Sequence, residues 1–477
     1  MIAAFDELWD QTRPAFSQRR TFLRARRLAL SALACLGRRT VTGLLTTSGR
    51  QFRDWSADYR VFEQERFRSQ GLFDVARRAV GRQLPAQEPF VALLDDTLLR
   101  KRGRKVAGAS WRRDPLGPPF CNNFIWGQRF LQVSAALPEQ SGASRARAIP
   151  VGLAHCPTPR KPRKHAPALD WEDYTRQAQH SRIGQQAART LESLRQHLDE
   201  DPGGRQRRLV VSVDGGFTNQ TLLKNLPPRV TLIGRIRKDA KLYALPQARP
   251  QGAGRKPAYG LRLPTPEELR QDDATPWIDV HAYAAGKTHT FQVKTLGPVR
   301  WRAAGGAHDL RLAVIRPLAY RPSKGAHMLY RDPVYLICTD PTLPLEKLVQ
   351  YYVWRWEIEL NFRDEKSLLG VGQAQVWTSK AVESVPSLLV SAYSLLMLAV
   401  QRVYGSVNIP FPRPKWRAKI QGQRISTSEA LGLLRVQLWG KALGVGNFSG
   451  FASSIHPDPM PEKFENSLPT ALLYANG

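Results

Sequence analysis

The amino-acid sequence predicts an α/β protein with a mixed sheet, a helical N-terminal region and a β-rich insertion. Residues 1 to about 85 show apolar positions at helical spacing. Residues 90–236 alternate between apolar runs and helical stretches, in the order three strands, helix, strand, helix, strand. Residues 237–333 lose the helical pattern and alternate as strands among prolines and glycines. These three observations carry the prediction of the fold class.

The helical N-terminal region is strongly basic. Its densest run of arginines comprises Arg19, Arg20, Arg24, Arg26 and Arg27. Residues 40–62 contain two short helical patterns separated by Gly49, as in a helix-turn-helix that places one helix in the major groove of DNA. Helical hairpins without DNA contacts show the same pattern, and the arginines can also form a solvated face. We favour DNA contact because of the charge of the whole chain.

The central sheet is predicted from apolar runs of strand length. The predicted strands are 90–94, 124–137, 148–154, 209–213 and 230–236. One long helix is predicted at 171–198. The first run ends at Asp95 and Asp96, and the fourth ends at Asp214, which two glycines follow. The pattern therefore predicts acidic residues at the ends of two strands of one sheet.

The insertion and the C-terminal part follow the same logic. Predicted strands of the insertion are 277–284, 288–296 and 310–318, followed by a strand at 334–338 and a helix from 343 onward. The uncharged stretch 384–401 contains serines, a tyrosine and Pro386, which suits a first helical turn. It therefore indicates a buried helix rather than a membrane span. The basic, proline-rich stretch 410–417 indicates a stiff linker.

The chain of 477 residues carries a large positive charge. It contains 71 Lys and Arg against 40 Asp and Glu, a formal net charge of +31. Such a surplus indicates a polyanionic partner and salt-sensitive binding. An acidic membrane surface is the competing polyanion, but no basic amphipathic tail or lipidation signal supports it. The N-terminus lacks a signal-peptide core and the four cysteines form no CxxC pair, so we expect a cytoplasmic protein without a zinc finger.

The most informative pattern lies within residues 352–366. Arg355, Glu359 and Lys366 follow Tyr352 at offsets of 3, 7 and 14. At about 100° per residue, these positions fall within roughly 60° of one another on one face of a helix. A carboxylate between two cations and a phenol suits phosphate, since glutamate can hold a divalent metal while Arg and Lys bind phosphodiester oxygens. The pattern alone leaves open a surface ion pair between Arg355 and Glu359.

Three carboxylates from distant segments complete the candidate site, namely Asp95, Asp214 and Glu359. Side by side they repel one another unless they share a cation, and Mg²⁺ or Mn²⁺ prefers such oxygen ligands. Two ions could activate water or a 3′-OH on one side of a phosphodiester and stabilise the leaving oxygen on the other. Each aspartate taken alone is more typical of a turn or a helix cap.

Together these residues resemble the signature of the bacterial insertion-sequence transposases of the DDE type. Their Y-x2-R-x3-E-x6-K pattern is matched without a gap by Tyr352, Arg355, Glu359 and Lys366. Residues 93–97 (LLDDT) and 213–217 (VDGGF) look like the first and second aspartate motifs of that family. The β-rich insertion before the glutamate also lies in the expected place. The resemblance covers about residues 40–400.

The resemblance implies a ribonuclease H-like core at residues 86–400, with the insertion at about 237–333. A DNA-binding domain at residues 1–85 would precede this core, and a C-terminal region at 401–477 would follow it. The implied activity is cleavage of transposon ends and transfer of the 3′-OH strands into target DNA. Asp95, Asp214 and Glu359 would hold two Mg²⁺ or Mn²⁺ ions. The implied enzyme works as a homodimer on terminal inverted repeats of double-stranded DNA in the bacterial nucleoid.

The resemblance also implies that Tyr352, Arg355 and Lys366 hold the phosphate next to a flipped base, on which aromatic residues stack. Trp356 lies where some relatives carry a stacking tryptophan, although core packing on the opposite flank of the helix is an equal alternative. Asp95 and Asp96 are adjacent, so the motif does not settle the first ligand. We favour Asp95, because the second position of this motif varies in relatives.

Two further basic clusters, residues 100–105 (RKRGRK) and 160–164 (RKPRK), fit contacts to the DNA backbone. The alternative for each cluster is a flexible solvated loop. His155, Cys156 and His165 lack a fourth ligand at suitable spacing, which disfavours a zinc site. The rival functions are a transposase-derived DNA-binding protein that no longer cuts, and a nuclease that cuts without joining. The intact carboxylates argue against the first rival.

Overall fold

The structure is a computed structural model of the chain. It describes residues 1–64, 66–114, 117–118, 120, 123–247, 257–304, 306, 308–321, 325–405 and 424–440. The predicted linker at 410–417, Cys121 and most of the region 401–477 lie outside the described residues.

Within the described residues, eleven strands form one sheet and two more form a small hairpin, β11 (Ala319–Tyr320) with β12 (Leu329–Tyr330). The strands of the large sheet are β1 (Phe90–Arg100), β2 (Ser110–Arg113), β3 (Phe124–Pro138), β4 (Ala146–His155), β5 (Leu209–Val213), β6 (Val230–Arg235), β7 (Leu242–Tyr243), β8 (Ile278–Ala284), β9 (Lys287–Trp301), β10 (Leu310–Ile315) and β13 (Val334–Cys338). Every strand predicted between residues 90 and 338 therefore has a counterpart.

The centre of the sheet has the order β4-β3-β1-β5-β6. β3 pairs antiparallel with both β4 and β1, whereas β1, β5 and β6 run parallel to one another. The parallel neighbours require a crossover, which the helices after β4 and β5 supply. This arrangement confirms the predicted ribonuclease H-like mixed sheet.

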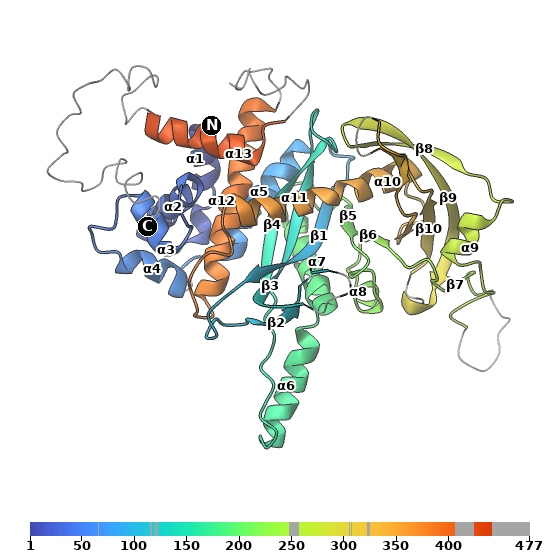
Figure 1. Cartoon of the computed structure of the whole chain (residues 1–477), viewed down its shortest axis with the longest axis horizontal. Coiled ribbons are helices and arrows are strands. Elements are labelled where there is room, and N and C mark those ends of the chain that lie inside the picture. The colour runs from blue at the N-terminus through green and yellow to red at the C-terminus, as the bar shows by residue number, and fades with distance from the viewer. Residues whose placement is uncertain are drawn as a thin grey trace.

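The insertion extends this sheet. β6 pairs with β13, which leads through β10 and β9 to β7 and β8. The strands at the right of Figure 1 thus continue the central sheet outward. The expected absence of helix in this part is wrong at α9 (Pro266–Gln271). That short helix is stabilised by a capping box, in which the Thr265 side chain and the Glu268 side chain each bond the other's backbone N–H.

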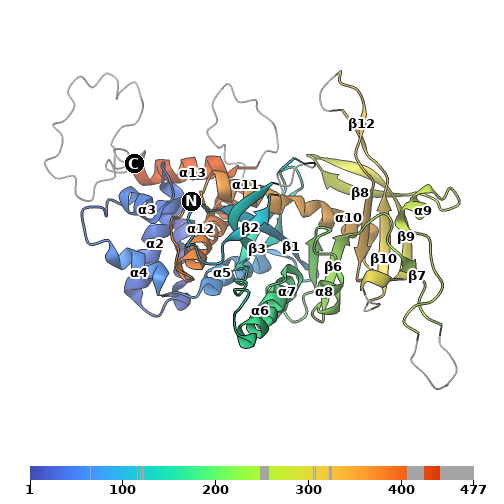
Figure 2. The ribbon, with the colours of Figure 1, turned by 60° about the horizontal axis from the view of Figure 1, so that its bottom comes forward.

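Both faces of the sheet are covered by helices (Figures 1 and 2). Besides α9, the α-helices of the described residues are α1 (Ile2–Asp10), α2 (Arg19–Ala34), α3 (Val41–Thr47), α4 (Ser56–Glu63), α5 (Ser69–Gln83), α6 (Ala168–His180), α7 (Ile183–Glu200), α8 (Gln220–Lys224), α10 (Leu345–Trp354), α11 (Trp356–Ser367), α12 (Ala381–Tyr404) and α13 (Thr427–Arg435), of which α6 alone projects away from the sheet. Along β1, Ala92 and Leu94 pack with α5, α7 and α12, while Val91 and Leu93 pack with α10 and α11. This alternation is the expected result of a strand buried on both faces.

Helix α12 joins the N-terminal helices to the sheet. It is buried over most of its length and packs against α1, α2, α5 and β4. By length and composition α12 could cross a membrane, but 94% of its apolar window is buried inside the protein. The prediction of a buried helix at 384–401 is confirmed, and Pro386 lies in its second turn.

Two predicted boundaries are wrong. β1 does not end before Asp95 but continues to Arg100, because its antiparallel pairing with β3 extends to Arg100 opposite Gly127. The predicted helix at 171–198 is two helices, α6 and α7, interrupted at residues 181 and 182. α7 buries an apolar face against the core, whereas α6 buries no residue and projects away from the molecule (Figure 1).

Candidate functional site

Asp95 and Asp214 lie side by side at the end of a parallel strand pair. The paired register of β1 and β5 ends at Leu94 opposite Val213, so the next residue on each strand is an aspartate. The Asp214 carboxylate is oriented by its own turn, since it accepts hydrogen bonds from the backbone N–H of Gly216 (2.9 Å) and Phe217 (3.2 Å). The second predicted strand end is thus confirmed. Asp95, in contrast, lies inside β1, at the end of only its parallel pairing.

The predicted single helix over 352–366 is broken at Arg355, between α10 and α11. The Ser212 hydroxyl donates a 2.9 Å hydrogen bond to the carbonyl of Tyr351. That carbonyl is the one which the Arg355 N–H would bond in an α-helix, and the Arg355 N–H donates to Tyr352 instead (3.1 Å). A side chain inserted into the helical ladder is a known cause of a kink. The break therefore originates in β5, two residues before Asp214.

At this break the Arg355 side chain bridges two of the predicted carboxylates. Its Nη1 lies 3.4 Å from Oδ2 of Asp95, and its Nη2 lies 3.0 Å from Oε1 of Glu359. The Arg355 side chain is only 14% exposed, and its Cζ lies 5.9 Å from the centre of the Tyr352 ring. The i,i+4 ion pair that the pattern left open is present, but it is shared with Asp95 and partly buried.

The electrostatics of Asp95 reflect this crowding. Burial raises the pKa of Asp95 to about 7, and the charge of Asp214 adds to the rise. The hydrogen bond from the Asp96 N–H and the charge of Arg355 act in the opposite direction. Two carboxylates are therefore close enough to repel each other in a poorly solvated place, which is where an added cation is most stabilised.

Asp96 belongs to the other face of β1. Successive side chains on a strand alternate, and the Asp96 carboxylate pairs with Arg129 (3.1 Å) rather than Arg355. Burial raises the pKa of Asp96, while the charges of Arg129, Arg112 and Lys366 lower it. Asp96 is thus neutralised by its own cations, whereas Asp95 adjoins Glu359 through Arg355.

The remaining predicted residues surround this centre. Tyr352 is half-buried, and its pKa is raised by burial and lowered by Arg355 and Arg235. Trp356 is 59% exposed, so core packing does not describe it. Lys366 is exposed at the end of α11, and its charge acts on Asp96. All seven predicted site residues therefore lie on β1, after β5 or along α10 and α11 at one region of the sheet.

The sequence interpretation missed Arg235 and the cleft that it lines. Arg235 ends β6, and its charge acts on the Tyr352 hydroxyl. With Gly215, Arg237 and Lys238 it borders a cleft of about 970 Å³ between the second aspartate turn and the insertion. The signal was available, because Arg235 ends a strand that runs parallel to β5 and so reaches the same edge of the sheet.

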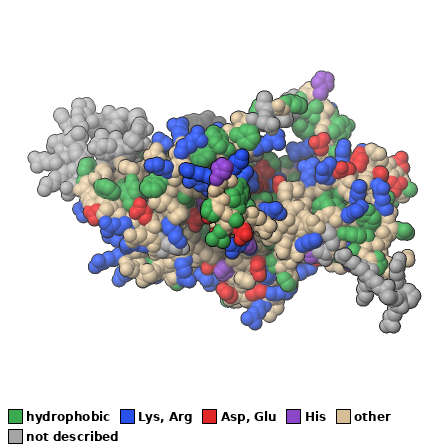
Figure 3. All heavy atoms as spheres, turned by 90° about the horizontal axis from the view of Figure 1, so that it is seen from below, with side chains coloured by type: hydrophobic (Ala, Val, Ile, Leu, Met, Phe, Trp, Pro, Cys, Tyr) green, Lys and Arg blue, Asp and Glu red, His purple; other side chains and the backbone are tan. Residues whose placement is uncertain are grey.

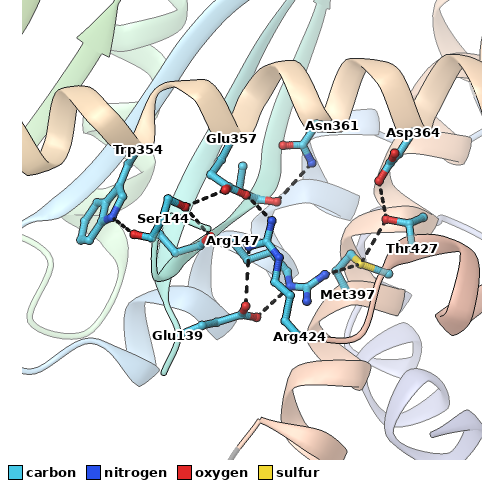
Figure 4. A network of polar contacts seen from close by, with 12 residues as sticks. Glu139, Ser144, Arg147, Trp354, Glu357, Asn361, Asp364, Met397, Arg424 and Thr427 are labelled. Atoms are coloured by element: carbon cyan, nitrogen blue, oxygen red, sulfur yellow. Dashed lines mark hydrogen bonds and ion pairs between the residues drawn. The ribbon is translucent and has the colours of Figure 1, made fainter. Parts of the chain in front are cut away.

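The opposite side of α11 is held by a buried polar network (Figure 4). Glu357 accepts a hydrogen bond from Ser144 (2.6 Å) and forms an ion pair with Arg424 (2.5 Å). Arg424 also lies 3.7 Å from Glu139, which pairs with Arg147 (2.7 Å). Because Glu357 is only 3% exposed, its charge depends on these partners. The segment before α13 thereby fixes the helix that carries Glu359.

The donor set fits a divalent cation of the Mg²⁺ or Mn²⁺ type. Asp95, Asp214 and Glu359 offer only carboxylate oxygens, and the pKa of Asp95 is already raised by an adjacent carboxylate. Among the described residues, no three His, Cys, Asp or Glu side chains are arranged so that they could already hold one ion. The Arg355 guanidinium lies between Asp95 and Glu359 and pairs with both.

Comparison with the curated proteins finds no match for this chain. A family model described as DDE superfamily endonuclease matches residues 13–307, which is more than half of the chain. The match contains Asp95 and Asp214 and ends before the helix that carries Glu359. The two aspartates thus lie within the match and meet at one edge of a ribonuclease H-like sheet. The chain belongs to the DDE superfamily endonucleases.

Proposed function

We propose that this protein is a DDE transposase that cuts transposon ends and transfers the 3′-OH strands into target DNA. Membership of the endonuclease family supports cleavage of DNA, and the net charge of +31 supports a nucleic-acid substrate. The observation that carries the proposal is the Arg355 bridge. It brings Asp95 and Glu359, which are 264 residues apart, to one guanidinium beside Asp214.

Asp95, Asp214 and Glu359 are the proposed holders of the metal. Bound there, Mg²⁺ or Mn²⁺, two per site, would activate the attacking oxygen and stabilise the leaving one. Asp214 is already oriented by its turn, and the raised pKa of Asp95 means that cation binding would also stabilise its charged form. Asp96 stays outside this set because Arg129 neutralises it.

The other predicted residues are proposed to hold DNA. Arg355 can exchange a carboxylate for a phosphate with the same planar fork, since both ligands present paired oxygens. Lys366 lies further along the same helix as a second cation. Tyr352 and the exposed ring of Trp356 would contact the nucleotide next to the cut.

The larger organisation is proposed from the same resemblance. Residues 1–85 would bind DNA, residues 86–400 with the insertion at 237–333 would carry out catalysis, and residues 401–477 would assist pairing or DNA contact. We infer a homodimer on the terminal inverted repeats, in the bacterial cytoplasm at the nucleoid. Inverted repeats on either side of the gene, together with a change of oligomeric state on adding them, would support this organisation.

The test is cleavage and joining of labelled duplexes that carry the DNA flanking the gene, with Mg²⁺ and a target plasmid. Wild-type protein should leave 3′-OH ends and join them to the plasmid. Glu359→Gln, Asp95→Asn and Asp214→Asn should bind these duplexes without cutting them. Glu346→Gln makes the same substitution at an exposed position on α10 and should cut normally.

Other outcomes identify the rivals. Binding without metal-dependent cleavage by the wild-type protein would show the DNA-binding protein that no longer cuts. Cleavage without joining would show a nuclease. Normal cleavage by Glu359→Gln would mean that the Arg355–Glu359 pair is structural.

A further inference from the structure

Residues 157–182, called the arm below, form a projection that packs on almost nothing. The arm lies between Cys156 and Gly184, both buried, yet none of its own residues is buried. It contains α6, whose 13 residues extend about 20 Å at 1.5 Å per residue. Figure 1 shows α6 standing away from the sheet and its covering helices. Folding alone does not explain a helix that buries no face.

The arm nevertheless has local features that hold its shape. Residues 157–167, called the basic segment below, contain Pro157, Pro159, Pro162 and Pro167, which restrict the backbone and make this segment a semi-rigid spacer. At the far end the Ala166 N–H bonds the Arg163 carbonyl (2.9 Å), which closes a turn. The Lys161 ammonium lies 5.7 Å from the centre of the Trp171 ring, so the basic segment is tied back to the helix. The arm is therefore presented as a preformed element.

The acids of the arm and most of its cations are separated along the chain. The basic segment carries four exposed cations at Arg160, Lys161, Arg163 and Lys164. The acids Asp170, Glu172 and Asp173 all lie on α6, where Asp173 pairs with Arg176. Among the described residues, no ion pair neutralises Arg160, Arg163 or Lys164. Figure 3, which views the molecule from the side of the arm, shows Lys and Arg side chains around the central projection, next to a hollow where acidic side chains are visible.

The arm begins beside β2, two strands from the strand that carries Asp95. The Thr158 hydroxyl at its base lies 3.0 Å from the Ser110 hydroxyl of β2 and accepts a hydrogen bond from Arg112. The charge of Arg112 also acts on Asp96, the neighbour of Asp95. A duplex that runs from Asp95 across β3 toward β2 would pass the base of the arm.

We propose that the arm is a DNA-backbone contact, in which Arg160, Lys161, Arg163 and Lys164 bind phosphates of the duplex on the β2 side of the cut. This inference rests on DNA being the substrate, as proposed above. A length of about 20 Å matches roughly half a turn of B-DNA, which repeats every 34–36 Å. Arg and Lys side chains on a preformed segment bind phosphates without sequence preference.

A second copy of this chain is the competing occupant, and two observations disfavour it. Stable protein interfaces have an apolar centre. The described part of the arm exposes one large aliphatic side chain, Leu169, which is 66% exposed. The cluster of positive charges on the basic segment would also have to be paired by acids on the partner, whereas phosphates supply the negative charge directly.

The experiment measures the affinity of the full-length protein for a labelled duplex over a series of salt concentrations, in EDTA so that nothing is cut. The test variant is Arg160→Gln, Arg163→Gln and Lys164→Gln combined. Each lost phosphate contact reduces the slope of log K against log salt by about 0.9, so the slope should become shallower by roughly 2 to 3. The control variant neutralises the acids on the same arm (Asp170→Asn, Glu172→Gln, Asp173→Asn) and should keep the wild-type slope.

A photo-crosslinking residue at Leu169 gives an independent readout. Crosslinks to DNA support the arm proposal, and crosslinks to a second copy of the chain overturn it. An unchanged salt slope in the variant with Arg160, Arg163 and Lys164 replaced also overturns the arm proposal. Neither readout needs cleavage, so a protein that binds through its arm but never cuts would refute the transposase proposal and leave the arm proposal standing.

Discussion

The Arg355 guanidinium lies 3.4 Å from the Asp95 carboxylate, across the break between α10 and α11. The same guanidinium reaches Glu359 at 3.0 Å. Two proposed metal ligands are therefore both paired with one protein cation. A metal that binds both carboxylates has to compete with this cation.

Replacing Arg355 with Ala should lower the melting temperature in EDTA and enlarge the increase that Mg²⁺ produces. In EDTA, the variant is less stable because the buried Asp95 has lost Arg355 as its ion-pair partner. When Mg²⁺ is added, the metal no longer competes with a guanidinium for the carboxylates. Removing a charge at this distance should tighten apparent Mg²⁺ binding roughly tenfold. Thermal unfolding across a Mg²⁺ titration measures both effects. Arg363→Ala removes an exposed arginine from the same helix and should leave the Mg²⁺ response unchanged. An identical response in Arg355→Ala and wild type would contradict the competition.

Lys366→Ala should weaken DNA binding while leaving the metal ligands intact. Loss of one phosphate contact predicts a salt slope about 1 unit shallower and cleavage reduced roughly tenfold. Residual cleavage should exceed that of Glu359→Gln, which loses a metal ligand. Quantitative cleavage assays at two salt concentrations measure the difference. The matched control is Lys347→Ala, which removes a lysine of α10 that is paired with Glu88. If the two lysine variants bind and cut alike, Lys366 does not contact the phosphate.

Glu365→Gln should stabilise the protein at alkaline pH. Burial raises the pKa of Glu365 from 4.5 to about 8, with Asp364 adding to the rise and the Gln132 hydrogen bond and Lys366 opposing it. A carboxyl group with a raised folded pKa holds its proton more tightly when folded, so wild-type stability falls as pH rises from 4.5 to about 8. Glutamine removes that loss and can still accept the Gln132 hydrogen bond.

Thermal unfolding at pH 5 and pH 9 tests this sign. The advantage of Glu365→Gln over wild type should be small at pH 5 and roughly 2–5 °C at pH 9. Glu346→Gln, at an exposed position, should show the same small difference at both pH values. An advantage that does not grow with pH would show that Glu365 is already ionised or solvated in the folded protein.

Arg424→Gln should destabilise the chain through Glu357, which would keep a buried charge without its cation. Removing one partner of such a pair costs about 3–5 kcal/mol. The double variant Arg424→Gln with Glu357→Gln should recover much of that loss. Denaturant unfolding of the four proteins in the cycle measures the coupling energy. Additive effects would mean that the segment before α13 does not hold α11.

The sequence alone predicted the strands well because each is a local apolar run. Residues 334–338 match β13 at both ends, and 209–213 match β5. Local patterns missed features that distant partners impose. β1 extends past Asp95 because β3 pairs with it beyond the apolar run. The interruption of 171–198 has no distant cause among the described contacts, and the apolar pattern did not distinguish the buried α7 from the exposed α6.

The candidate site shows the same division. The helical face of Tyr352, Arg355 and Glu359 followed from spacing, and the spatial meeting of the aspartates followed from strand ends. The break between α10 and α11 at Arg355 could not be predicted from spacing. Its cause is Ser212, which is 139 residues before its hydrogen-bond partner Tyr351. The support of Glu357 by Arg424 was equally hidden, since an ion pair between distant residues leaves no periodic pattern.

The unbroken path from β1 through β13 to β9 has a mechanical consequence. Backbone hydrogen bonds run across every strand boundary from β1, which carries Asp95, to the insertion. The described strands of the catalytic core and of the insertion therefore belong to one continuous sheet that resists bending. A DNA duplex that touches both must adapt its own curvature to a fixed spacing. We therefore expect fluorescence energy transfer between labels at the two ends of the duplex to rise on binding. The same transfer between labels on β3 and β8 should stay constant.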